Sequence, residues 1–179
     1  MSESVLPELV LPLEDRDHHI GPITARYRLV GYLDFECPHC AHVHPIVKEL
    51  VRELGDDLCY VFRHFPQARE HPHARSASLA AEAADMQGKF WLMHDRLFEN
   101  QSDLSETVLH RLARELPLEM ERFEMDRASE TAARRVDEDY ADGQENGVEE
   151  TPTFFVNGQL HVGSYEFLPL LEALRAPRE

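Results

Sequence analysis

Asp34-Phe35-Glu36-Cys37-Pro38-His39-Cys40 joins two segments with different hydrophobic patterns. Before it, residues 24–34 are extended and largely apolar, and after it apolar side chains recur at helical spacing as far as Leu54. Cys37 and Cys40 therefore lie where a strand is expected to give way to a helix. Two thiols separated by two residues at such a junction can cycle between a dithiol and a disulfide, so the motif predicts redox chemistry.

The pattern around the motif predicts a strand–helix–strand unit. We expect a helix over residues 37–54, bent at Pro45, where the missing backbone N–H removes a hydrogen bond. Gly55-Asp56-Asp57 breaks this helix, and residues 58–65 form a second, mostly apolar strand. A connection of this length between two strands favours a parallel, right-handed arrangement.

A long helical region separates this unit from a short sheet-forming end. Residues 72–148 have helical patterns, and the highly charged stretch 119–140 predicts a solvated helix that covers one face. The dipeptide Asn157-Gly158 predicts a tight hairpin turn, because both positions of this turn type need a positive φ. The elements expected at this end are strands 153–156 and 159–162 and a closing amphipathic helix at 165–175.

The composition excludes several classes of partner. The 179 residues suit one globular domain and include 34 acidic and 18 basic side chains, for a net charge of −16. Such a surface repels phosphate backbones and anionic head groups, so we expect neither nucleic-acid nor membrane binding. No apolar run approaches the roughly 18 residues of a membrane helix.

The amino-terminal residues predict a cytoplasmic location. Residues 1–17 carry five acidic groups and no apolar stretch that resembles the core of a signal peptide. A cytoplasmic chain with three cysteines is expected to use them for catalysis or metal binding rather than for a structural disulfide framework.

Four stretches, in this order and spacing, resemble the DsbA-like thiol-disulfide oxidoreductases. They are residues 34–40, His71-Pro72-His73-Ala74, Lys89-Phe90-Trp91-Leu92-Met93-His94-Asp95 and Thr151-Pro152-Thr153-Phe154-Phe155-Val156-Asn157-Gly158. The resemblance implies an α/β thioredoxin fold, with a mixed central sheet and an inserted all-helical subdomain. The division expected is a flexible leader at 1–16, a thioredoxin-like domain at 17–66 and 149–179, and a helical insertion at 67–148.

The residue types of the motif suit thiol–disulfide exchange. Cys37 is expected at the start of the helix, where unpaired amides and the helix dipole lower the pKa of a thiol, so it would be the attacking sulfur. Cys40 lies one turn further in and suits the resolving role. Pro38 helps to fix the helix start. His39 can give the Cys37 thiolate a positive charge or a hydrogen bond, which favours an oxidising or isomerising couple.

Thr151-Pro152 is the second part of the expected site. The resemblance implies a cis peptide bond here, which would leave the Thr151 backbone free to pair with an extended substrate beside Cys37. Without the Cys37–Cys40 motif, a trans proline that opens an edge strand would be the favoured interpretation of Pro152. The partners implied are protein or small-molecule thiols and disulfides, and no cofactor is expected.

Gly31 departs from the pattern of the family. Thioredoxin-like enzymes often carry a buried carboxylate six residues before the first cysteine, where it accepts a proton from the resolving thiol. Glycine cannot do this, and strand alternation does not establish that Asp34 or Glu36 faces Cys40 instead. Slow turnover, or proton transfer through water or another acid, is therefore expected.

Other candidate residues have simpler interpretations. Cys59 lies in an apolar strand and is expected to be a buried structural thiol. His42 and His44 could join Cys37 and Cys40 in a zinc site, but a continuous helix directs them away from the thiols, so no metal site is expected. Packing or helix capping is expected for His71 and His73, and a place in the core for Phe90, Trp91 and Phe98. The acidic runs 137–139 and 149–150 are expected to be solvated surface.

Three hypotheses for function remain at this point. The first is a cytoplasmic DsbA-like protein disulfide oxidoreductase that uses the Cys37–Cys40 couple. The second is a protein whose dithiol switches a partner surface without multiple turnover, and the missing carboxylate at Gly31 gives it some weight. The third is a Cys/His zinc-binding module. The sequence leaves open the substrate, the direction of the reaction, its recycling partner and the oligomeric state.

Overall fold

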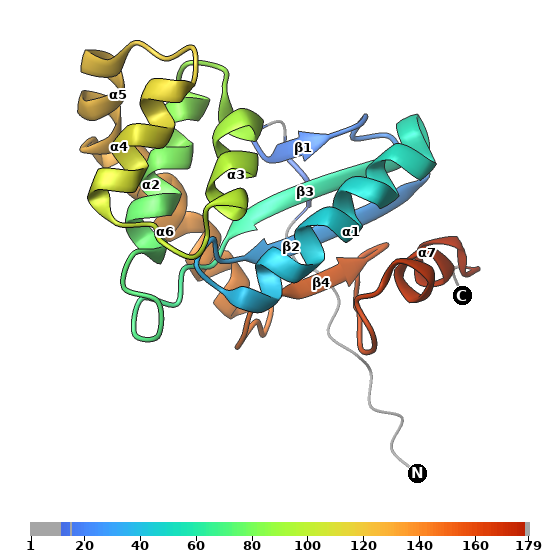
Figure 1. Ribbon diagram of the computed structural model, residues 1–179. Coiled ribbons are helices and arrows are strands. Elements are labelled where there is room, and N and C mark those ends of the chain that lie inside the picture. The colour runs from blue at the N-terminus through green and yellow to red at the C-terminus, as the bar shows by residue number, and fades with distance from the viewer. Residues whose placement is uncertain (1–11, 15, 178–179) are drawn as a thin grey trace.

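The computed structural model describes residues 12–14 and 16–177, so most of the predicted leader, residues 1–11 and 15, lies outside the described residues. In the described residues, five strands form one mixed sheet in the order β1-β3-β2-β4-β5. Figure 1 shows β1, β3, β2 and β4 in this order. The strands are β1 (His18–Ile20), β2 (Tyr27–Leu33), β3 (Leu58–His64), β4 (Thr153–Val156) and β5 (Gln159–Leu160). The helices are α1 (Pro38–Leu54), a 3-10 turn (Gly55–Asp57), α2 (Ala74–Asp85), α3 (Phe90–Glu99), α4 (Glu106–Glu115), α5 (Met120–Arg127), α6 (Glu130–Glu145) and α7 (Phe167–Arg175).

The pairing of the strands confirms the predicted α/β thioredoxin fold with a mixed sheet. β2 lies at the centre and pairs parallel with β3 and antiparallel with β4. β1 pairs antiparallel with β3, and β5 pairs antiparallel with β4 across the turn at Asn157-Gly158. Both turn residues have positive φ, as this turn requires. α1 connects β2 to β3 and ends at Gly55, which also has a positive φ.

The sheet has a hydrophobic layer on each face because side chains alternate along its strands. On one face, Leu29 and Leu33 of β2 belong to the large core shared with α1, α3 and α7. On the opposite face, Val30 and Tyr32 belong to a smaller core that includes Phe65. The Tyr140 ring of α6 stacks on Phe65 there, at 4.5 Å between ring centroids.

The helical region α2–α6 lies at one end of the sheet (Figure 1). Its central helix, α2, packs against α3, α4, α5 and α6. Small side chains let these helices approach closely, and those fully buried in α2 are Ala74, Ala77, Ala80, Ala81, Ala83 and Ala84. Among the described residues, no helix combines the length and the apolarity that crossing a bilayer would need.

The smaller core is joined to α6 and to the start of the chain by a buried ionic network. Arg63 of β3 is 3 % exposed and donates hydrogen bonds to the carboxylates of Asp17, at 3.0 and 3.1 Å, and Asp142, at 2.6 Å. The Tyr32 hydroxyl donates to the same Asp142 oxygen at 2.6 Å. The Arg63 cation thus lies between two carboxylates in a region from which water is excluded, and its bond to Asp142 ties β3 to α6.

Two predictions about this part of the structure were wrong, and one strand was not predicted. The charged stretch 119–140 forms two helices, because Ser129 caps a new helix by accepting a hydrogen bond from Ala132 N at 3.2 Å. Asp139 is 2 % exposed rather than solvated, and its carboxylate accepts a hydrogen bond from the backbone N–H of His64 at 3.0 Å. β1 was not predicted, because three residues are too few to show a period.

Candidate functional site

The two thiols of the motif lie where α1 begins. Cys37 has an extended backbone, with φ −74° and ψ 122°, and Pro38 is the first residue of the helix. Cys37 is 4 % exposed and Cys40 is fully buried, and both are free thiols. Helix formation leaves the first backbone N–H groups of α1 without intrahelical partners, and these groups face the Cys37 sulfur. The site therefore holds a reduced dithiol in which Cys37 is the more accessible sulfur.

Hydrogen bonds divide the roles of the two sulfurs. The pKa of Cys37 is lowered to about 5, and the largest cause is a hydrogen bond from the Cys40 thiol. Burial acts in the opposite direction. The Thr151 side chain and the backbone N–H groups of Cys40 and His39 lower the pKa further. The hydroxyl oxygen of Thr151 is buried and makes no hydrogen bond to any other described residue in the reduced protein, so it is free to turn toward the Cys37 sulfur. Burial and the neighbouring Cys37 raise the pKa of Cys40 well above its ordinary value. Cys37 is therefore set to be a thiolate at neutral pH while Cys40 keeps its proton.

His39 acts through its backbone rather than through its ring. Its side chain is exposed, and no hydrogen bond of the imidazole is found in the described part of the chain. Its backbone N–H contributes to the low pKa of Cys37. The sequence predicts a charge or hydrogen bond from the imidazole, whereas the contact of His39 with Cys37 that the structure shows is made by its backbone N–H.

The loop before β4 faces Cys37. The peptide bond between Thr151 and Pro152 is cis. The Cys37 sulfur lies 3.4 Å from the Thr151 carbonyl oxygen, to which it donates a hydrogen bond when it is protonated, and this contact joins residues 114 positions apart in the sequence. The Gln101 side chain, in the loop after α3, donates a hydrogen bond to the Cys37 carbonyl oxygen. The structure thus brings Cys37, Cys40, Thr151 and Pro152 together at one end of the sheet.

Position 31, where thioredoxin-like enzymes often carry a buried carboxylate, has no room for such a side chain in this protein. A Cβ atom built on Gly31 would lie 2.6 Å from Leu33 Cδ1 and 2.7 Å from Phe154 Cε1. These distances are far inside van der Waals contact, so a larger side chain would have to displace part of the core. Packing against Phe154 on the neighbouring strand β4 explains the glycine.

Asp34 and Glu36 instead form pairs with histidines beside the dithiol. Asp34 is fully buried, its backbone N–H donates to Cys40 Sγ at 3.4 Å, and its carboxylate lies 2.7 Å from Nδ1 of His71. The Glu36 carboxylate lies 2.9 Å from Nδ1 of His73. The sequence noted both histidines but predicted packing or capping roles for them, because the long connection from β3 to α2 hides their contacts with the motif.

The zinc site weighed from the sequence is not assembled. The His42 imidazole pairs with Glu166 at 2.9 Å, and the His44 ring stacks on Phe98 at 4.9 Å between centroids. In residues 12–14 and 16–177, two groups of at least three potential ligands have donor atoms within 4.8 Å of one another, and neither contains a cysteine. The groups are His18-His64-Glu82 and His44-His94-Asp95.

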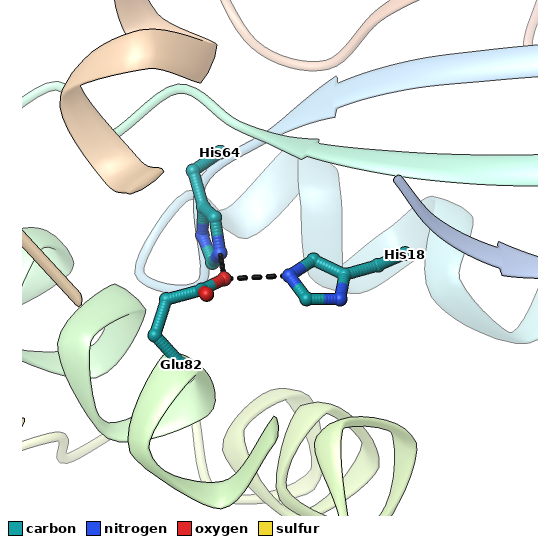
Figure 2. Close-up of side chains that lie close together, drawn as sticks. All are labelled: His18, His64 and Glu82. Atoms are coloured by element: carbon teal, nitrogen blue, oxygen red, sulfur yellow. Dashed lines mark hydrogen bonds and ion pairs between the residues drawn. The ribbon is translucent and has the colours of Figure 1, made fainter. Parts of the chain in front are cut away.

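The first of these groups is built as a hydrogen-bonded junction between the sheet and the helical region. Figure 2 shows the imidazoles of His18 and His64 on one carboxylate oxygen of Glu82, at 2.6 and 2.7 Å. Tetrahedral zinc would need these ligand atoms to be about 3.3 Å apart, given bonds of about 2.0 Å. A metal on Nε2 of His64 would also move the proton to Nδ1, which is buried without a partner among the described residues. The geometry fits hydrogen bonds better than metal coordination.

Cys59 is separated from the redox pair. It is fully buried in β3, in the smaller core, whereas Cys37 and Cys40 belong to the large core on the opposite face of the sheet. Burial, the largest influence, raises the pKa of the Cys59 thiol. It is a structural side chain, as the sequence predicts.

The low pKa of Cys37 gives a direct prediction for the reduced protein. A thiol whose pKa is depressed is a thiolate above that pKa and becomes protonated as the pH falls through it. Absorbance at 240 nm should therefore show one thiolate with a midpoint near pH 5, and iodoacetamide should label Cys37 at a constant rate above about pH 6. A single midpoint near the ordinary cysteine value of about 8.5 would contradict the assignment.

Known proteins share the sequence pattern and the fold of this chain. The family model described as thioredoxin matches residues 14–174. A thioredoxin-like oxidoreductase from Silicibacter pomeroyi is 27 % identical, with a TM-score of 0.80, and the match covers 89 % of this chain and 91 % of that one. BdbD from Bacillus subtilis, in its oxidised form, is 23 % identical with a TM-score of 0.80, and the match covers 97 % of both chains.

Curated relatives contain a similar stretch within a longer protein. The Na(+)/H(+) antiporter NhaA 1 of Mycolicibacterium vanbaalenii is 42 % identical over 179 residues, which is 98 % of this chain but 29 % of the antiporter. NhaA 1 of Salinispora arenicola is also 42 % identical, over 98 % of this chain and 26 % of the antiporter. The chain thus spans less than a third of the length of these relatives. On its family match, its sheet and its solved structural neighbours, the chain belongs to the thioredoxin family and has the fold of DsbA-like thiol-disulfide oxidoreductases.

Proposed function

We propose that this protein is a DsbA-like disulfide oxidoreductase in which Cys37 attacks and Cys40 resolves. The observation that carries the proposal is the opposite direction of the two pKa shifts at the start of one helix. Cys37 is held as a thiolate at neutral pH, and Cys40 is held as a thiol behind it. This is the division that a nucleophile and its resolving partner need.

The reaction follows from this division. To reduce a substrate disulfide, the Cys37 thiolate attacks one sulfur, forms a mixed disulfide and expels the other substrate sulfur as a thiolate. Cys40 then loses its proton and attacks Cys37, which forms the Cys37–Cys40 disulfide and releases the second substrate thiolate. In the oxidising direction the same steps run backwards, and the electron pair of a substrate dithiol ends on Cys37 and Cys40.

The cis-proline loop is the proposed site for the substrate backbone. Thr151 presents its carbonyl oxygen to the Cys37 sulfur at 3.4 Å, so a segment that pairs with this backbone lies within reach of the nucleophile. A hollow beside the loop has an acidic lining that includes Glu70, Glu149 and Glu150. Protein and small-molecule thiols and disulfides are the substrate class that we propose. Neither nucleic acid nor membrane lipid is proposed as a partner.

A turnover assay with a peptide dithiol tests the enzyme hypothesis against the redox switch. With glutathione disulfide as the final oxidant, we expect oxidised peptide to exceed the protein by at least about tenfold, because exchange regenerates the Cys37–Cys40 disulfide. The packing around Gly31 favours the switch, since it removes the usual proton acceptor. Formation of no more than one equivalent of product would favour the switch and contradict the enzyme.

The direction and the location of the reaction are separate proposals. Equilibration with glutathione buffers gives the potential of the Cys37–Cys40 couple, and a value well above the cytosolic glutathione poise would assign an oxidase rather than a reductase. We propose a cytoplasmic location, for which the support is the composition and cysteine content of the sequence. Fractionation of cells that express the natural protein tests this location.

A further inference from the structure

His71 is held in place by a carboxylate that is fully withdrawn from water. The Asp34 carboxylate accepts hydrogen bonds from the backbone N–H groups of Glu36, at 2.8 Å, and Gln67, at 2.9 Å, and pairs with Nδ1 of His71 at 2.7 Å. Asp34 is fully buried, and the His71 side chain is 17 % exposed. A buried carboxylate that pairs with one imidazole favours its charged form, so the pair holds a cation at the edge of the site.

The backbone of Asp34 also contacts both cysteines of the motif. The backbone N–H of Asp34 donates to Cys40 Sγ at 3.4 Å, and the Asp34 carbonyl oxygen accepts from the backbone N–H of Cys37 at 3.2 Å. The residue that holds the imidazole therefore also contacts both members of the redox pair. The connection from β3 to α2, which carries Gln67 and His71, is thereby fixed against the start of α1.

The charged groups around His71 that contribute most all raise its pKa. Burial alone would lower its pKa, but the hydrogen bond and charge of Asp34, the Cys37 thiolate and the Glu36 carboxylate together raise it above the ordinary value. These charged groups come from the segment between β2 and α1. An interaction between two charges is mutual, so an imidazolium that is stabilised by the thiolate stabilises the thiolate equally.

We propose that His71, held as an imidazolium by Asp34, is a positioning residue that stabilises the Cys37 thiolate and makes the Cys37–Cys40 disulfide a stronger oxidant. The proposal rests on the proposed role of Cys37 as the attacking thiolate. It also assigns to His71 the charge that the sequence predicts for His39.

The balance of the reaction explains the effect on the potential. A substrate dithiol gives two electrons to the Cys37–Cys40 disulfide and becomes a disulfide. Of its two protons, one ends on Cys40 and the other passes to solvent, which leaves a negative charge on Cys37. The imidazolium of His71 stabilises only this reduced state, because the disulfide carries no charge. Each tenfold loss of that stabilisation should lower the reduction potential by about 30 mV.

The decisive test compares His71→Gln with the matched control His73→Gln. His73 pairs with Glu36 at 2.9 Å in the neighbouring turn, but its side chain is 41 % exposed. We expect His71→Gln to raise the pKa of Cys37 and to reduce the equilibrium constant for oxidation of glutathione by about three- to tenfold. His73→Gln should leave both quantities close to those of the wild type, since water screens an exposed pair. Equal values in the two variants would overturn the proposal.

A second measurement needs no variant and therefore does not depend on the folding of one. NMR titration of the His71 imidazole should give a higher pKa in the reduced protein than in the disulfide form, where the thiolate is absent. The difference should match the rise in the Cys37 pKa that His71→Gln causes. An unchanged His71 pKa would overturn the proposal. Failure of the proposed function would look different, because wild-type Cys37 would then titrate as an ordinary thiol and show no exchange.

Discussion

Replacing Cys37 by serine should reduce disulfide exchange by about 10⁴-fold or more, to the uncatalysed background. A serine hydroxyl is not ionised near neutral pH, so the hydrogen bonds that favour a thiolate at this position would have no anion to stabilise. The stopped-flow rate with a model disulfide is the measurement. The variant should keep the fold, because serine is close to cysteine in size and position 37 lies at the start of α1 rather than within a strand or helix.

Two further cysteine variants test whether Cys37 alone is the nucleophile. Cys40→Ser should keep the fast first attack but accumulate mixed disulfides, because the resolving sulfur is absent, and mass spectrometry detects the adduct. Cys59→Ala should exchange at the wild-type rate, since Cys59 lies on the other face of the sheet. Residual fast exchange in Cys37→Ser, or loss of exchange in Cys59→Ala, would contradict the assignment of the nucleophile.

Arg63→Leu should lower the free energy of unfolding by about 3–5 kcal/mol, the largest stability effect that we expect from a single charge. The leucine leaves the buried carboxylate of Asp142 without Arg63, and it leaves Asp17 only the more distant guanidinium of Arg135, at 3.7 Å. Urea denaturation at pH 7 measures the change. Because leucine is apolar, it places no new polar group in the core. The decrease in the free energy of unfolding therefore comes from the carboxylates that lose Arg63.

An exposed arginine provides the matched control for this experiment. Arg75 pairs with Asp137 at 2.6 Å, but the two side chains are 42 % and 60 % exposed. Arg75→Leu should therefore change the free energy of unfolding by less than about 1 kcal/mol. Adding Asp17→Asn and Asp142→Asn to Arg63→Leu should recover part of the loss, because neutral amides cost less to bury. Similar losses for Arg63→Leu and Arg75→Leu would show that burial of the network does not determine its contribution.

The central elements could be predicted because their signals are local. The alternation in residues 27–33 and the helical spacing after Cys37 reflect burial on one face, and Asn157-Gly158 reflects the geometry of a single turn. The location of Cys37 and Cys40 could be predicted because the end of a strand and the start of a helix are both visible in the neighbouring sequence. Thr151-Pro152 could be placed only through the resemblance, since 114 positions separate Thr151 from Cys37.

The contacts that depend on long connections could not be predicted. Asp34 meets His71 across 37 positions, and His18 meets Glu82 across 64, and no periodicity records either pairing. Asp139 was expected at the surface because it lies in an acidic run, although a backbone N–H of β3 draws it inward. Asp34, His18 and Glu82 are buried where a partner on another element compensates them, and a one-dimensional pattern cannot show such partners.

The position of Cys59 also determines which covalent isomers the folded chain can form. Of the three thiols in the sequence, two lie at the start of one helix, and the third lies in the core on the far side of the sheet. A mispaired disulfide from Cys59 to either of the others would have to cross the sheet, which requires unfolding. Oxidation of the native protein is therefore restricted to a single intramolecular product, and a thiol count should fall from three to one without passing through scrambled species.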